Sequence, residues 1–213
     1  IIIESGAILQ IMGDAYVDRD MNEGGKYENH MKASMEYFFE VEPYKSLRER
    51  FNVYAVKVIS PNAEFTEGCK HRINYDNNLC FEYAAKVPNM NLDRVTIVNV
   101  VNNPDPMFVS GYTNMYETGA SVAHIERGGP SSIIVHEAGG HGFAKLLDEY
   151  IYGGYEGNRI PDNELVTFQN MIKTDYHNRG WGANVDITYD PDKVIWSHFL
   201  KDERYKEEVG VYQ

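Results

Sequence analysis

The segment Val95–Val101 constrains the fold more than any other part of the chain, because it is the clearest β-strand in the sequence. It reads Val-Thr-Ile-Val-Asn-Val-Val and is closed by Asn102-Asn103-Pro104. β-Branched residues favour strands, and the Asn-Asn-Pro cluster is typical of a loop. We therefore expect this strand at the centre of a sheet.

Several other segments carry the periodicity of helices or strands. Further strands are predicted at residues 7–12 and 52–60, and a short edge strand is predicted at residues 120–125. Helices are predicted at residues 27–39, 131–150, 163–176 and 192–205. Strands that alternate with helices indicate a layered α/β domain in which at least part of the sheet is parallel. The length of 213 residues fits one domain over residues 1–213.

Charge and hydropathy exclude two classes of partner. The chain carries 32 acidic and 20 basic residues, for a formal charge of -12, and has no long basic run that could follow a phosphate backbone. No stretch approaches the ~20 apolar residues of a membrane helix, and Ile1-Ile2-Ile3 is followed at once by Glu4. We expect no nucleic acid, no membrane span and no intact signal peptide, and the sequence leaves the oligomeric state open.

The two cysteines, Cys69 and Cys80, flank a polar segment. Their spacing excludes a Cys-x-x-Cys metal site. A disulfide that closes this loop and a pair of reduced thiols are both compatible with the sequence, because disulfides persist mainly outside the cytosol.

The segment His136-Glu137-Ala-Gly-Gly-His141 indicates a catalytic metal site. In the H-E-x-x-H pattern of zinc peptidases, two histidines four apart share one face of a helix, and the glutamate between them is the general base. Here the histidines are five apart, which on a regular α-helix separates them by about 140° around the axis. Two adjacent glycines in an apolar helix cost about 1 kcal/mol each against alanine, so Gly139 and Gly140 suggest a backbone requirement.

Two local structures would bring His136 and His141 together. A π-type turn with i→i+5 hydrogen bonds returns residues five apart towards one face, and such turns occur mostly at functional sites. Alternatively the helix ends near Gly140 and a non-helical turn delivers His141. We favour the π-type turn.

A catalytic zinc normally takes three protein ligands, so a third is needed. We predict Asp148, seven residues beyond His141, with Gly142 breaking the helix so that the chain turns back under the metal. The neighbouring Glu149 suits a role in orienting a histidine N–H. His198 is an alternative ligand, and both acids could instead be solvated surface charges.

The whole segment His-Glu-Ala-Gly-Gly-His-Gly-Phe-Ala-Lys-Leu-Leu-Asp-Glu-Tyr resembles the active-site signature of the bacterial IgA-peptidase family of secreted zinc metallopeptidases. Residues 8–16, 51–60 and 195–205 are similar to other parts of that family. The resemblance implies a layered zincin- or metzincin-like catalytic domain with a mixed sheet and a central active-site helix. It also implies one catalytic Zn²⁺ and a secreted, periplasmic or cell-surface location in a bacterium.

The sequence departs from the family pattern in two places. The usual motif lacks the extra glycine, although a similar H-E-x-x-G-H spacing occurs in dipeptidyl peptidase III. Family members continue beyond the position of Gln213, so we expect any methionine turn beneath the metal to lie past it.

Together the residues and the resemblance predict a zinc-dependent endopeptidase that acts on a protein or peptide, with Glu137 as general base for a zinc-bound water. Tyr150, His124 and His198 are candidates for holding the oxyanion. The strand at 120–125 is a candidate for pairing with an extended substrate. Two alternatives remain: a non-catalytic surface module that retains the zinc site, and a zinc hydrolase of a non-peptide amide.

Overall fold

The computed structural model describes residues 6–59, 76–103, 109–127, 132–149, 162–205 and 207–211. The chain divides into two compact units, Ile1–Phe143 and Ala144–Gln213, which are described one at a time below. That both units form a single catalytic domain stays a prediction. Within the described residues, no helix combines the length and the apolar character needed to cross a membrane.

The first unit is built on a five-stranded mixed sheet with the order β2-β1-β3-β5-β4. The strands are β1 (Ala7–Asp14), β2 (Phe51–Ala55), β3 (Val95–Val101), β4 (Val109–Met115) and β5 (Ser121–Arg127). Strands β2, β1, β3 and β5 run parallel, and β4 pairs antiparallel with β5. β3 is therefore the central strand, as its sequence predicts, and every one of its residues is buried.

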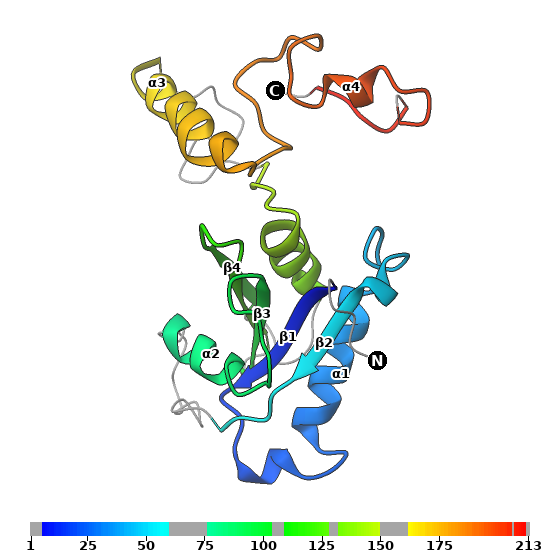
Figure 1. Cartoon of the computed structure of the whole chain (residues 1–213), viewed down its shortest axis with the longest axis vertical. Helices are drawn as coiled ribbons and strands as arrows, with labels where there is room; N and C mark the ends of the chain where they lie inside the picture. Colours follow the sequence, from blue (N-terminus) through cyan, green and yellow to red (C-terminus); the bar gives the residue numbers. More distant parts are fainter. Residues whose placement is uncertain are drawn as a thin grey trace. The chain divides into compact units, whose positions relative to one another are not determined.

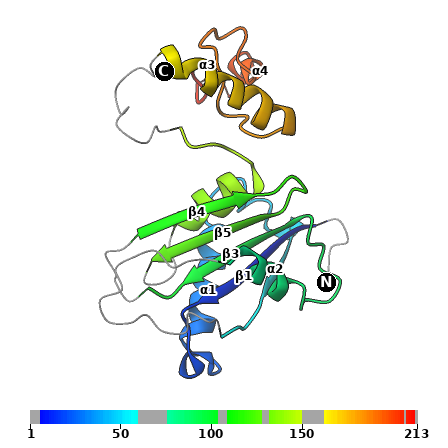
Figure 2. The ribbon, with the colours of Figure 1, turned by 90° about the vertical axis from the view of Figure 1, so that its left-hand side faces the viewer.

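Helices cover both faces of this sheet. Helix α1 (Lys26–Phe38) and helix α2 (Asn77–Ala84) lie on opposite sides of it (Figure 1, Figure 2). Two 3-10 turns, η1 (Asp18–Met21) and η2 (Arg48–Arg50), precede α1 and β2, and a π-helix, η3 (Val135–Phe143), follows β5. This arrangement confirms the predicted layered α/β class with a partly parallel sheet.

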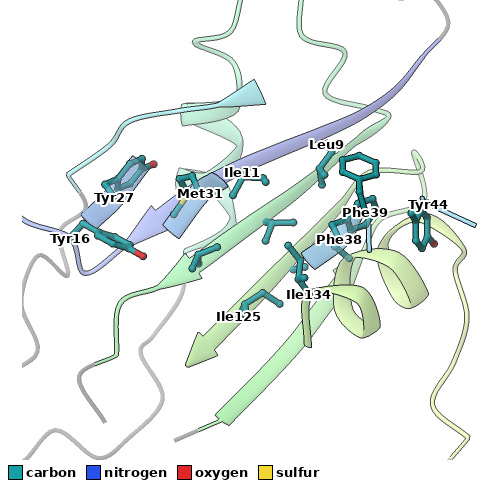
Figure 3. Close-up of a cluster of buried hydrophobic side chains, with 14 residues drawn as sticks. Leu9, Ile11, Tyr16, Tyr27, Met31, Phe38, Phe39, Tyr44, Ile125 and Ile134 are labelled. Carbon is teal, nitrogen blue, oxygen red and sulfur yellow. The ribbon is translucent and has the colours of Figure 1, made fainter. Parts of the chain in front are cut away.

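Alternate residues of the strands pack into two separate hydrophobic cores, as the period of a strand requires. The core on the α1 side also includes Ala138 of η3 and Ile134, which directly precedes η3, and Figure 3 shows how its side chains gather between sheet and helices. Its strand residues are Leu9, Ile11, Val98, Val100, Ala123 and Ile125. The core on the α2 side is smaller and includes Met12, Val95, Ile97, Val122 and Cys80. The larger core therefore fixes η3 on one face of the sheet.

A buried polar network ties α2 to the other face. The His124 ring is 1% exposed, and its Nδ1 and Nε2 atoms lie 3.1 Å from Asn99 Nδ2 and 2.7 Å from Asn77 Oδ1. Because Nδ2 of an amide only donates and Oδ1 only accepts, these contacts assign the ring proton to Nε2. Tyr112 of β4 stacks on the same ring, with centroids 4.9 Å apart. His124 is thus a structural residue of the α2 face.

The second unit consists of short helices and turns. Its elements are α3 (Asp162–Asn170), the π-helix η4 (Met171–Tyr176), the 3-10 turn η5 (His177–Arg179) and α4 (Ser197–Leu200). α3 and η4 confirm the helix predicted at residues 163–176. The helix predicted at 192–205 is wrong, because only Ser197–Leu200 is α-helical. Aspartates explain the difference: Asp186 and Asp202 accept hydrogen bonds from the N–H groups of Ile195 and Arg204, which competes with helix formation.

The predicted edge strand at residues 120–125 is also wrong in its position. The corresponding strand β5 lies between β3 and β4, so it has no open edge for a substrate. The edge strand on that side of the sheet is β4, which was not predicted because Val-Ser-Gly-Tyr-Thr-Asn-Met has few apolar residues. The strand predicted at 52–60 is shorter than expected: β2 ends at Ala55, and the carbonyl of Val56 accepts a hydrogen bond from the Tyr27 hydroxyl.

Cys80 lies on α2 and carries a free, buried thiol. Burial, together with the nearby charges of Asp14 and Asp76, raises the pKa of this thiol to about 12. Its proposed disulfide partner, Cys69, lies outside the described residues, so the disulfide stays a prediction.

Candidate metal centre

The two histidines lie on a π-helix. Residues Val135–Phe143 form i→i+5 hydrogen bonds, which confirms the π-type turn favoured by the spacing of His136 and His141. The helix is shorter than the predicted 131–150, and Gly142 does not break it. The chain leaves the helix at Lys145, whose φ of 55° lies in the left-handed region and cannot continue a right-handed helix.

The paired glycines have different roles. Neither Gly139 nor Gly140 has a positive φ, so neither is needed for a left-handed backbone conformation. A Cβ at Gly139 would lie 2.7 Å from the Tyr44 ring, whereas a Cβ at Gly140 would meet only the Val135 carbonyl oxygen, at 4.0 Å. The Tyr44 hydroxyl donates to the Gly139 carbonyl at 2.6 Å. Gly139 is therefore needed for close packing.

The histidine side chains meet as two ligands of one metal would. Nε2 of His136 and Nε2 of His141 lie 3.2 Å apart, and the two rings are nearly perpendicular, at 81°. Two nitrogens bound at about 2.0–2.1 Å to a tetrahedral zinc are about 3.3 Å apart. The observed separation thus fits a shared zinc.

Asp148 supplies a third donor group. One ligand atom from each of His136, His141 and Asp148 lies within 4.8 Å of the other two, and this is the one such group among the described residues. Two imidazoles and one carboxylate are a donor set typical of catalytic zinc, whereas structural zinc sites use mostly cysteine. The chemistry of the donors therefore fits the metal that the motif predicts.

The segment that carries Asp148 is held by a loop of its own unit. The side-chain amide of Asn184 forms two hydrogen bonds with the backbone of Leu147. Its Oδ1 accepts from Leu147 N–H at 3.0 Å, and its Nδ2 donates to the Leu147 carbonyl at 2.8 Å. Gly182 N–H donates to the Lys145 carbonyl at 2.7 Å. These bonds fix the backbone on both sides of Leu146. Burial of Lys145 lowers the pKa of its ammonium group to about 8.

Glu137 is buried between η3 and the edge strand β4. Its side chain is 4% exposed, and Thr113 Oγ1 lies 2.8 Å from its Oε2. A Cβ at Gly111 would lie 2.6 Å from Glu137 Oε1, so only glycine leaves room for the carboxylate there. Glu137 does not belong to the group of three ligand atoms, and its role as the general base stays a prediction.

The comparison with protein families decides the class. The model of the IgA peptidase M64 family matches residues 5–206 of the 213 in the chain. The chain belongs to this family. It is accordingly a peptidase, a hydrolase of the metallo type whose substrates are proteins or peptides. A search of curated proteins finds no match.

The other predicted residues of this M64 peptidase lie outside the three-residue group. Glu149 is exposed and accepts a hydrogen bond from Asn184 Nδ2 at 2.9 Å, so its role in orienting a histidine stays a prediction. His198 lies on α4, with its ring 4.1 Å from that of Phe199, and Tyr150 lies outside the described residues. His124 is on the sheet face opposite Glu137, which removes it as an oxyanion donor.

Sequence reasoning missed the partners that shape the site. Gly111, Thr113 and Tyr44 contact the helix from positions 24 or more residues away in the chain. The available signal was the pair Gly111 and Thr113, two apart and so on one face of a strand, but it is visible only once residues 109–115 are known to form β4.

The two glycines give a matched test of the packing. Gly139→Ala should destabilise the protein by about 1–3 kcal/mol, because the new methyl must displace the buried Tyr44 ring. Gly140→Ala has room for its methyl and should be neutral or stabilising by up to about 1 kcal/mol. Urea unfolding of the metal-free variants measures both values. Equal losses from the two substitutions would show that the Tyr44 contact does not require glycine.

Proposed function

We propose that this M64 peptidase is a zinc-dependent endopeptidase with Glu137 as its general base. The observation that carries the proposal is the 3.2 Å separation of the two histidine Nε2 atoms, with an Asp148 oxygen in the same group. In a chain of a metallopeptidase family, two imidazoles at the spacing of zinc ligands, with a carboxylate in the same group, support a catalytic zinc.

The chain's own residues have distinct tasks in this proposal. His136, His141 and Asp148 would hold the ion. When bound, zinc supplies a Lewis acid that polarises a carbonyl and makes water acidic enough to ionise near neutral pH. Glu137 accepts the proton of the water that attacks the peptide carbonyl and then delivers it to the leaving amine. Both transfers need the carboxylate held in one position, and its burial against β4 supports this.

The fold and the family support two further parts of the proposal. A mixed sheet with a histidine-bearing helix packed on one face is compatible with a zincin-like catalytic domain. The resemblance to secreted bacterial enzymes supports action outside the cytoplasm, at the cell surface, in the periplasm or in the medium.

The substitution Glu137→Gln tests the role of the base. It keeps the shape of the side chain and leaves both imidazoles in place, so zinc content should stay at one ion per chain while turnover falls by about 10²–10⁴-fold. Cleavage of a peptide library, followed by mass spectrometry with and without chelator, measures the activity. Glu82→Gln, an exposed glutamate of α2, is the control and should behave as wild type. Near-normal turnover by a fully zinc-loaded Glu137→Gln protein would reject the mechanism.

The third ligand is tested by zinc affinity. Asp148→Ala should weaken zinc binding by more than about 100-fold, since even partners of a ligand contribute about 10–100-fold. The adjacent Glu149→Ala should weaken zinc binding by at most about 10- to 100-fold, the range for a partner of a ligand, and His198→Ala should leave it unchanged. Competition with a chelating dye measures each constant. Loss of zinc in His198→Ala with retention in Asp148→Ala would show that the ligand assignment is wrong, although the peptidase class would stand.

A further inference from the structure

The carboxylate of Glu137 has two close neighbours on the edge strand β4. Thr113 Oγ1 lies 2.8 Å from Glu137 Oε2 and 3.0 Å from the Glu137 backbone oxygen. The hydroxyl has one proton, and an ionised carboxylate accepts a stronger hydrogen bond than a peptide carbonyl does. The proton of Thr113 is therefore best placed on Oε2.

Gly111 limits the carboxylate from the other side. An added Cβ at residue 111 would approach Glu137 Oε1 to 2.6 Å, Cγ to 2.8 Å and Cδ to 3.0 Å. The whole carboxyl group thus lies directly over the backbone of Gly111. Since Gly111 and Thr113 share a strand face, one strand provides both the space and the hydrogen bond.

The residue between Gly111 and Thr113 is not placed to contact the Glu137 carboxylate. Tyr112, between Gly111 and Thr113, points to the opposite face and stacks on His124. β4 is fixed in register against β5, where Thr113 is paired with the buried Ala123 and Tyr112 with His124. The position of the Thr113 hydroxyl is therefore fixed by the pairing of β4 with β5.

We propose that Thr113 is a positioning residue for Glu137, with Gly111 providing the space in which the carboxylate lies. This inference rests on the proposed function, in which Glu137 is the base. One carboxylate oxygen is held by the Thr113 hydroxyl, so the group keeps a single orientation during proton transfer. A displacement of about 1 Å in a reacting group can lower the rate by about 10²-fold, so a hydrogen bond that fixes the carboxylate should preserve the rate.

Three variants of the full chain separate the hydroxyl from the shape of the side chain. Thr113→Val removes the hydroxyl and keeps the volume, and it should lower kcat by about 10- to 100-fold with KM within about twofold. Thr113→Ser restores the hydroxyl and should stay within about threefold of wild type. Thr118→Val is the control, because it removes a threonine hydroxyl in the turn between β4 and β5, one that accepts a hydrogen bond from Ala120 N–H at 3.4 Å. It should leave kcat unchanged.

Two further measurements show that the effect passes through Glu137. The zinc dissociation constant of Thr113→Val, measured by competition with a chelating dye, should stay within about twofold of wild type. In a Glu137→Gln background, Thr113→Val should cause no additional loss of the remaining turnover, because residues that act as a unit are not additive.

The outcomes for Thr113 and for Glu137 are distinguishable. Normal kcat in Thr113→Val, or a loss in Thr113→Ser as large as that in Thr113→Val, overturns the positioning role even if Glu137→Gln is inactive. A Thr113→Val protein that loses zinc overturns it as well. Full activity of Glu137→Gln instead removes the proposed function on which the inference rests.

Discussion

The hydrogen-bond register of η3 is the constraint on which the site depends. On an α-helix His136 and His141 would lie about 140° apart, and no single ion could reach both. The i→i+5 register brings their Nε2 atoms to 3.2 Å. The register is supported by tertiary contacts: Ala138 is buried in the larger core, and a Cβ at Gly142 would lie 2.9 Å from Thr96 Cγ2. Packing against the sheet thus compensates for a helix type that is rare in isolation.

The polar residues on the two faces of the sheet have different roles. On the α1 side, β4 receives the Glu137 carboxylate at Gly111 and Thr113, and an ionised group is costly to bury unless it has such hydrogen bonds. On the α2 side, His124 links Asn99 to Asn77 and so joins the sheet to α2. Successive side chains of β4 and β5 point to opposite faces of the sheet, which keeps these two groups apart. The same two strands therefore serve the site on one face and stability on the other.

The sequence predicts the local chemistry well and the tertiary partners poorly. The strand Val95–Val101 and the π-type turn between the histidines follow from composition and from a spacing of five, both of which are local. The edge strand β4 was not predicted because its apolar pattern is weak, and the contact of Thr113 with Glu137 was missed for the same reason. Tyr44 could not be found, since it meets Gly139 across 95 positions of sequence. The chain leaves the helix at Lys145 and not at Gly142. This end could not be predicted, because a lysine in the left-handed region of backbone conformation has no clear sequence signal.

X-ray absorption spectroscopy at the zinc edge, on protein carrying one equivalent of zinc, tests most directly that η3 brings both histidines to one metal. The account predicts a first shell of nitrogen and oxygen at about 2.0–2.2 Å, with the outer-shell scattering of two imidazoles and no sulfur. The scattering of one imidazole should disappear in either His136→Ala or His141→Ala. A wild-type spectrum that shows one imidazole or none, or a shell made only of oxygen, would contradict the shared site.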